Sequence, residues 1–373
     1  MKLINAKVLG GDFTFSKCDL EISDDKKIKR VAKKIAYSQD ELVIDCEGFT
    51  IVPGFIDIHI HGAAGRDTCE GTREAIGEIA EYLLSNGVTS FCPTTMTVDI
   101  DTIKNALSAA QDCMVNPPDG ARIIGVNMEG PFISPEKKGA QNEKYVLKPN
   151  FELFESLQNE FGGIIKLVDV APEEDDGFGF IKSAKKISRV SLAHSTADYD
   201  TAKASFEAGV SHATHLFNAM TGFNHRAPGA VGAVFENKNV TAELICDGKH
   251  IHPSVVKSVF EIMGDRICVI SDALMLSGMP EGTEGELGKL PISIKNGTCV
   301  LDDGTIAGSI SNLHEELKNL VSWGVPLETA VKAMSLNPAK VTGTDDFIGS
   351  IEEGKCADLV ILDDELNIVG VYH

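Results

Sequence analysis

Two histidines stand at alternate positions of a short apolar stretch, GFIDIHIHG at residues 54–62. Alternate side chains of an extended strand point to the same face. His59 and His61 are therefore predicted to lie together inside the fold, while Ile58 and Ile60 face a covering layer of helices. Neutral imidazole is a common ligand of zinc and iron, so this spacing indicates a metal site.

Other titratable residues stand near the ends of apolar runs. They are Glu129 in NMEGPF, His194 in LAHS, His215 in THLFNAM and Asp272 in VISDA. A buried carboxylate costs several kcal/mol unless it is paired or binds a metal, which favours Glu129 as a ligand. Each histidine alone could be a satisfied core residue, and Asp272 could cap a helix. Asp272 could instead move a proton during hydrolysis.

The elements that must position these residues alternate along the chain. Eight apolar runs have the composition of strands, and amphipathic stretches that close on glycine follow most of them. The runs are residues 54–61, 89–95, 123–130, 165–172, 190–195, 212–218, 241–248 and 267–273. Eight strand–helix units predict an α/β fold with a (β/α)8 TIM-type barrel. Chemistry in such barrels is carried out at the carboxyl ends of the strands, where the titratable residues are expected.

The two ends of the chain have a different pattern. Residues 1–53 and 346–373 contain short strand-like runs separated by polar turns, and they predict one small β-sandwich domain. Residues 54–345 are predicted to form the metal-dependent barrel domain. Within them, residues 285–305 contain an Asn-Gly turn and are predicted to be a hairpin insertion after the eighth strand.

The composition restricts the possible partners. The chain has 34 basic and 55 acidic residues and a net charge of −21, which argues against nucleic-acid binding. No run is long and apolar enough to predict a membrane span or a signal peptide. The nine cysteines are dispersed without a CxxC pair, which favours reduced thiols and a cytoplasmic location.

Taken in order, several motifs resemble those of the N-acetylglucosamine-6-phosphate deacetylase family in the amidohydrolase superfamily. They are PGFIDIHIHG, EGPF, LAHS, THLFNAM, HRAPG, DGKHIHP, ISDA and GSIEEGKCADLVIL. The resemblance implies a homodimer that hydrolyses the acetamide of an amino-sugar 6-phosphate, a small-molecule substrate. It implies Glu129, His194 and His215 as metal ligands and Asp272 as the catalytic acid and base. His59 and His61 match a pair that some members retain, which favours a site for one or two divalent ions (Zn, Fe, Co or Mn).

The resemblance also implies a set of substrate-binding residues. They are Ala140, Gln141, Asn218, Ala219, Arg226, Asp247, Gly248, Lys249, His250, Ile306, Ala307 and Gly308. Arg226 and His250 are the expected phosphate partners, with part of the pocket supplied by a second subunit and a lesser role for His225. Gln141 departs from the histidine of some members, at a position expected to face the reacting amide. Glutamine can donate a hydrogen bond there but carries no titratable charge.

Three alternatives stay open at this point. N-acetylgalactosamine 6-phosphate would require the same chemistry. A deaminase or cyclic amidase of the superfamily would use a carboxylated lysine at the end of the fourth strand, whereas Lys166 stands near the start of that strand. A non-catalytic barrel would have lost at least one site group, and all the candidate residues are present.

Overall fold

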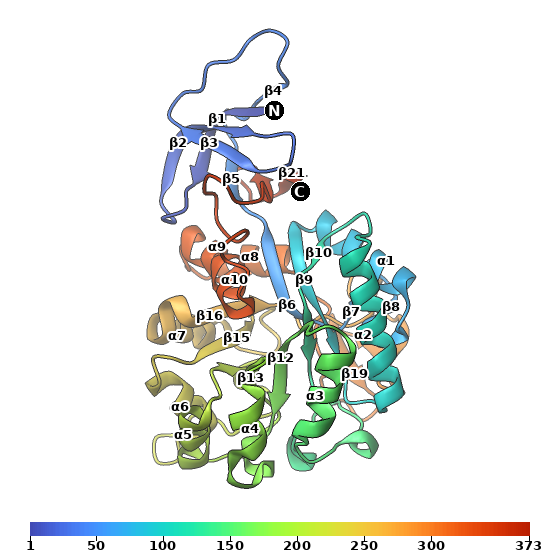
Figure 1. The fold of residues 1–373 in the computed structure, drawn as a ribbon. Helices are drawn as coiled ribbons and strands as arrows, with labels where there is room; N and C mark the ends of the chain where they lie inside the picture. Colours follow the sequence, from blue (N-terminus) through green and yellow to red (C-terminus); the bar gives the residue numbers. More distant parts are fainter.

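The computed structural model describes residues 1–373 and contains a barrel of parallel strands with a smaller sheet at one end (Figure 1). The barrel strands are β6 (Phe55–Ile60), β9 (Val88–Thr95), β10 (Arg122–Ile123), β11 (Val126–Met128), β12 (Ile165–Val170), β13 (Arg189–Leu192), β14 (His212–Ala213), β15 (Thr241–Ile245) and β16 (Ile267–Ile270). All their pairings are parallel.

Hydrogen bonds between the last and first strands close the ring. The Asp272 backbone N–H donates to the His59 carbonyl at 2.9 Å, and the Ser271 hydroxyl donates to the Asp57 carboxylate at 2.6 Å. The fold-class prediction is therefore confirmed for the barrel.

Helices cover the outside of the barrel (Figure 1). They are α1 (Arg73–Ser85), α2 (Ile100–Val115), α3 (Phe151–Glu160), α4 (Gly179–Ala184), α5 (Tyr199–Ala208), α6 (Gly229–Glu236), α7 (Pro253–Met263), α8 (Leu313–Ser322), α9 (Leu327–Met334) and α10 (Leu336–Thr342). Helix α1 shows why these segments fold as they do. The Thr72 side chain caps its first turn, and the buried Ile76, Ile79 and Leu83 recur at the three- and four-residue spacing of one helix face.

The two ends of the chain form a seven-stranded sheet with its own buried core, as the fold-class prediction required. Its strands are β1 (Lys2–Leu9), β2 (Phe15–Ile22), β3 (Ile28–Ala32), β4 (Val43–Asp45), β5 (Thr50–Pro53), β20 (Leu359–Leu362) and β21 (Ile368–Tyr372). Strand β20 pairs antiparallel with β5, which leads directly into β6. Both termini lie in this sheet (Figure 1). The division into residues 1–53 with 346–373 and residues 54–345 stays a prediction.

The insertion after β16 folds into three antiparallel strands. They are β17 (Glu284–Leu287), β18 (Leu290–Lys295) and β19 (Thr298–Leu301). Asn296 and Gly297 turn the chain between β18 and β19 with φ of 55° and 66°, as the Asn-Gly pair predicted. A further short hairpin, β7 (Gly62–Ala63) with β8 (Arg66–Asp67), follows β6.

Three features differ from the strand predictions. Strand β14 ends at Ala213, well before residue 218. The predicted run 123–130 is interrupted at Gly125, whose φ of 152° breaks the extended conformation. The pairing of β6 with β9 is also irregular, because its register shifts between Asp57 and Ile60.

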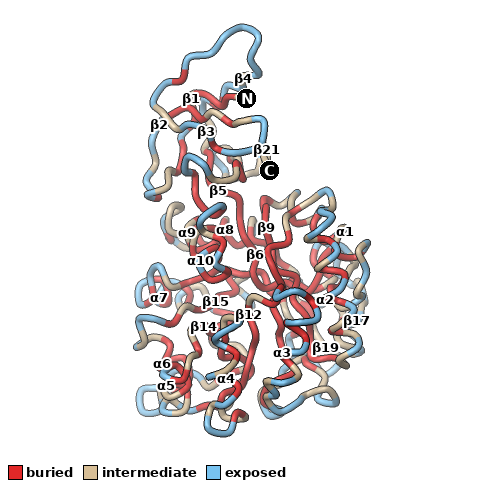
Figure 2. The backbone as a smooth tube through the Cα atoms, in the orientation of Figure 1, coloured by how far each residue is buried: buried red, intermediate tan, exposed pale blue.

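The two isoleucines that were expected to face the same helices pack in different core clusters. Ile60 packs in the large core cluster, whereas Ile58 packs in a smaller cluster with Leu167 and Ile245. No helix is long and apolar enough to cross a membrane. The barrel centre is the most continuously buried part of the molecule (Figure 2).

Candidate functional site

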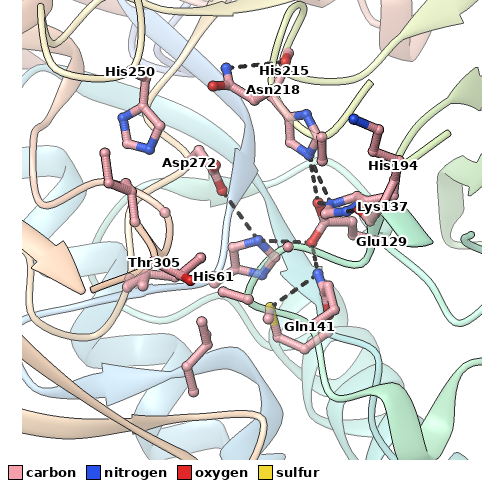
Figure 3. A pocket seen from close by; sticks show the side chains of 18 of the residues that line it. His61, Glu129, Lys137, Gln141, His194, His215, Asn218, His250, Asp272 and Thr305 are labelled. Atoms are coloured by element: carbon pink, nitrogen blue, oxygen red, sulfur yellow. Dashed lines mark hydrogen bonds and ion pairs between the residues drawn. The ribbon is translucent and has the colours of Figure 1, made fainter. Parts of the chain in front are cut away.

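A cavity of about 380 Å³ lies at the carboxyl ends of the barrel strands (Figure 3). Candidate residues from several strand ends line it, among them His61, Glu129, His194, His215 and Asp272. The structure therefore brings together side chains that lie far apart in the sequence, as the strand-end argument predicted. Of the proposed ligand set, His59 alone lies beneath the cavity rather than in its lining, and it is completely buried.

Three of these side chains leave their strands through an unusual backbone conformation. His194, His215 and Asp272 have φ of 43°, 28° and 46°, a region that residues other than glycine rarely adopt. Such conformations cost about 1–3 kcal/mol each and concentrate at functional sites. Each residue lies two positions beyond the last residue of its strand, where the turn directs its side chain into the cavity.

The histidines and Glu129 form two groups that share the carboxylate. In one group, Nε2 of His59 lies 3.2 Å from Nε2 of His61, which lies 3.3 Å from Glu129 Oε2. In the other, Nε2 of His194 and Nε2 of His215 each lie 3.0 Å from Glu129 Oε1 and 3.1 Å from each other. Within each group, the potential ligand atoms lie within 4.8 Å of one another.

This arrangement fits divalent metal ions. Two ligand atoms bound at about 2.1 Å to one tetrahedral ion lie about 3.4 Å apart, close to the spacings of both groups. The Nε2 atoms of each histidine pair face each other and the same carboxylate, so a shared cation would satisfy lone pairs that otherwise repel. The donor set suits zinc, iron, cobalt or manganese.

Oxygen acceptors hold three of the imidazoles in this orientation. His59 Nδ1 lies 2.9 Å from Glu243 Oε2, and His194 Nδ1 lies 2.8 Å from the Lys137 carbonyl. His61 Nδ1 lies 3.3 Å from the Thr94 carbonyl. A proton placed on Nδ1 leaves Nε2 free to bind a metal, as in the outer contacts that orient metal-bound histidines.

Glu243 was not among the residues predicted from the sequence. Its carboxylate also accepts the backbone N–H of His215 at 3.1 Å, so it supports both histidine groups. Burial alone would raise its pKa, but the charge on His59 and the hydrogen bonds from His212 and His59 outweigh burial and lower it. An acidic residue inside the apolar run TAELI was the available signal.

Asp272 lies beside the histidine pair. Its Oδ1 is 3.3 Å from His61 Nε2 and 3.4 Å from His59 Nε2. Burial opposes ionisation, but the neighbouring imidazoles of His59 and His61 outweigh it and lower the pKa of Asp272. Asp272 is therefore a carboxylate that can accept a proton next to the two groups that could hold metal ions.

Gln141 contacts Glu129 directly. Its Nε2 donates to Glu129 Oε2, and its carboxamide oxygen accepts the Thr97 backbone N–H at 2.8 Å. Gln141 lines the cavity as the resemblance implied, but this N–H is already engaged by the carboxylate. These two hydrogen bonds fix the Gln141 side chain, and the one to Glu129 also orients that carboxylate.

The residues implied for substrate binding divide into two sets. Ala140, Gln141, Asn218, Ala219, His250, Ile306 and Gly308 line the central cavity. The structure does not bring the others into it. Ala307 is completely buried, and Asp247 and Lys249 line an adjoining cavity of about 440 Å³ that shares His250. Gly248 packs near Trp323, where an added Cβ would lie 3.2 Å from the indole ring.

Arg226 also lies outside the central cavity. It is exposed and lines a separate cavity of about 580 Å³, which shares Lys137 with the central one. His225 is exposed as well.

The Asp247 carboxylate orients the His250 ring and favours its protonated form. Its Nδ1 lies 2.8 Å from Asp247 Oδ2. Burial opposes a charge on the ring, but the hydrogen bond and charge of Asp247 outweigh it and raise the pKa of His250. A protonated His250 in the cavity wall favours an anionic ligand group.

Several further residues line the cavity that the sequence did not single out, among them Met96, Lys137, Leu274, Leu287 and Thr305. Leu287 belongs to β17, so the insertion contributes to the wall. No spacing pattern distinguished these residues, because loops that are distant in the sequence bring them to the site.

Comparison with known proteins places this geometry in a family. The Amidohydrolase family matches residues 50–372. The N-acetylglucosamine-6-phosphate deacetylase of Bacillus subtilis is 36% identical over 329 residues, covering 86% of this chain and 82% of the relative. The N-acetylgalactosamine-6-phosphate deacetylase of Escherichia coli O157:H7 is 33% identical, covering 86% of each chain.

A solved structure extends the comparison to the whole fold. A variant of N-acetyl-D-glucosamine-6-phosphate deacetylase from Mycobacterium smegmatis, in complex with N-acetyl-D-glucosamine-6-phosphate, superposes with a TM-score of 0.91. The two are 28% identical, and the match covers 100% of this chain and 97% of the other. With its barrel, its strand-end histidines and its shared carboxylate, the chain belongs to the amidohydrolase family.

Proposed function

We propose that the chain is a metal-dependent deacetylase that hydrolyses N-acetylglucosamine 6-phosphate to glucosamine 6-phosphate and acetate. The observation that carries the proposal is the pair of histidine groups sharing Glu129, with Asp272 beside them, in a cavity lined by His250. This combination provides for metal-assisted hydrolysis at one end and for recognition of an anion at the other. The named activities of the similar proteins support the same substrate.

Glu129, His194 and His215 would hold one divalent ion, and His59 and His61 with Glu129 would hold a second. When bound, such an ion lowers the pKa of water and polarises the carbonyl oxygen of the substrate. We propose one or two ions from zinc, iron, cobalt and manganese, because the ligand types suit all four.

Asp272 is proposed as the catalytic acid and base. Its carboxylate accepts a proton from the attacking water as the water oxygen bonds to the acetyl carbon. It then returns the proton to the amide nitrogen as the C–N bond breaks, which releases the amine and acetate. Gln141 holds Glu129 in place during these steps.

At the other end of the cavity, His250 is proposed to bind the phosphate. The Asp247 hydrogen bond orients the ring, and the raised pKa favours its charged form. Lys137 lines both the central cavity and the cavity of Arg226, so it provides a second cation in the wall between them. We propose a homodimer in which the exposed Arg226 completes the phosphate site of the partner. A cytoplasmic enzyme agrees with nine free cysteines.

An acetate-release assay tests the proposal. The metal-loaded chain is expected to release acetate from N-acetylglucosamine 6-phosphate, and a chelator is expected to abolish the activity. N-acetylgalactosamine 6-phosphate is included, because one similar protein is named for that epimer. Acetate release from the galactosamine epimer alone would identify that epimer as the substrate. Acetate release from neither sugar phosphate would overturn the proposal.

A further inference from the structure

A second cavity lies at the opposite end of the barrel strands. It has a volume of about 510 Å³ and is lined by the first residues of β12 and β13 and by the end of α10. Arg189 begins β13, and His194 follows it by five residues. At about 3.3 Å per residue, the two ends of this strand are roughly 16 Å apart, so the cavity is separate from the catalytic one. Helix α10, whose last residues line the cavity, lies on the side of the barrel nearest the small sheet (Figure 1).

Four cations line this cavity without a carboxylate. They are Lys166, Lys185, Lys186 and Arg189, and no aspartate or glutamate is among the lining residues. None of the four forms an ion pair within 4.0 Å. This is unusual in a chain whose net charge is −21. Burial lowers the pKa of Arg189, and no carboxylate offsets that effect.

The backbone makes room for two of these side chains. A Cβ on Gly125 would lie 2.2 Å from Lys166 Cγ, and a Cβ on Gly209 would lie 2.2 Å from Lys185 Cδ. Both glycines also have a φ that other residues rarely adopt, 152° and 144°. The lysine stems therefore lie in slots that a side chain at either glycine would close.

Two of the cations already have a structural role. Lys185 Nζ donates to the Ala208 carbonyl at 2.7 Å, and Arg189 Nε donates to the Val341 carbonyl at 2.7 Å. These contacts stabilise the carboxyl ends of α5 and α10. The Lys166 and Lys186 ammonium groups make no hydrogen bond to the protein, so their donors are available to a ligand.

We infer that this cavity binds a small dianion of the phosphate type, either inorganic phosphate or a phosphomonoester. Lys166 and Lys186 would contact the oxygens, while Lys185 and Arg189 add positive charge at the walls. Small-molecule sites have volumes of about 300–1,000 Å³, a range that includes this cavity. The inference rests on the lining residues and not on the deacetylase activity.

Crystals soaked with tungstate, a tetrahedral dianion with strong anomalous scattering, test the location. An anomalous peak is expected between Lys166 and Lys186 in the wild-type chain and not in the K166A/K186A double variant. A peak in the catalytic cavity with none here would overturn the inference.

Titration with inorganic phosphate and with glucosamine 6-phosphate tests the affinity and the source. If the site recognises the phosphate group alone, K166A/K186A should affect both ligands in the same way. With each ligand, one binding event should be lost or become at least tenfold weaker. Loss with the sugar phosphate only would identify the phosphomonoester as the ligand. The matched control K238A/K257A removes two exposed lysines elsewhere. An equal loss in the control would show a general charge effect and refute the site.

Lys166 is half-buried, so its replacement could impair folding. K186E provides the second variant, because Lys186 is exposed and makes no contact that the fold requires. Reversing this one charge is expected to weaken the same binding event by at least tenfold. Unchanged binding in K186E would contradict a contact with Lys186.

Discussion

His194, His215 and Asp272 illustrate what a sequence shows at the scale of single residues. Their types and strand-end positions were enough to predict them as site residues. Their left-handed backbone conformation was not predictable, because it depends on the turns that follow each strand. Glu243 was missed for a related reason. Glu243 supports the site through its contacts with His59 and His215, and these contacts form only when strands β6, β14 and β15 meet.

The role of Asp272 gives the first prediction. D272N keeps the shape of the side chain but removes its ability to accept a proton, so kcat should fall by about 10²–10⁴-fold. The measurement is acetate release at saturating substrate, with circular dichroism and bound-metal content to confirm that the fold and the metal site persist. The exposed D101N is the matched control and should keep full activity. Near-normal turnover in D272N would show that another group moves the proton.

The shared carboxylate gives a prediction for metal content. H59Q/H61Q removes one histidine group but leaves Glu129, His194 and His215, so bound metal should fall by one ion per chain. Elemental analysis after metal loading and desalting measures this change, with the exposed H252Q as the control. If the double variant binds as much metal as the wild type, the pair does not hold an ion.

At the scale of elements, a buried network connects the loops that carry the site. Glu316 of α8 accepts the Cys246 backbone N–H at 2.9 Å and the Ser311 hydroxyl at 2.7 Å. Ser309, two residues before Ser311, donates its backbone N–H to the Asp272 carbonyl at 2.7 Å. Cys246 precedes the segment that holds His250. One helix thereby supports the loop of Asp272 and the loop of His250.

This network predicts a difference between two variants of Glu316. Burial raises its pKa well above the ordinary value, so the neutral acid is favoured and glutamine is a close substitute. E316A leaves two buried donors without an acceptor, at about 1–3 kcal/mol each. Urea unfolding should therefore show a much larger loss of stability for E316A than for E316Q. Equal losses would mean that glutamine does not replace the carboxyl group as the acceptor of these two hydrogen bonds.

Element boundaries were predictable only in part. The long helices follow from apolar periodicity and from caps such as Thr72, which act within a few residues. The shortness of β14 and the register shift in β6 do not, because both depend on how neighbouring strands fit around a closed ring.

At the scale of the whole molecule, a partly buried ion pair joins the barrel to the small sheet. Arg122 of β10 donates to Asp358 at 2.8 Å, and Asp358 precedes β20. His373 Nδ1 also lies 3.0 Å from this carboxylate. The sequence predicted that both chain ends would form one small β-sandwich domain. It could not predict this contact, which depends on how that sheet docks on the barrel.

The junction predicts a pH dependence of stability. Burial opposes ionisation of Asp358, but the hydrogen bond from His373 and the charge of Arg122 outweigh it and lower its pKa. A carboxyl whose pKa is lower in the folded state stabilises the fold above its unfolded pKa of about 3.9 and loses that effect as the pH falls through the folded value. D358N should therefore be less stable than the wild type by about 1–3 kcal/mol near pH 6.

The difference between D358N and the wild type should shrink as the pH falls below about 4, because the unfolded wild-type carboxyl is protonated first and the folded one at a lower pH. Thermal unfolding of both chains from pH 3 to pH 7 measures it. A difference that does not change over this range would exclude the charge of Asp358 as its source.

The hydrogen bonds between the first and last strands of the barrel have a consequence for how the enzyme folds. His59 and Asp272 supply the backbone hydrogen bond that joins the first strand to the last, and both also belong to the site. Their contact spans more than two hundred residues of chain, a separation that makes loop closure slow. Catalytic competence should therefore be acquired late in folding. A nascent chain could form most of its helices and strands while still unable to turn over substrate, until its eighth strand emerges and joins the first.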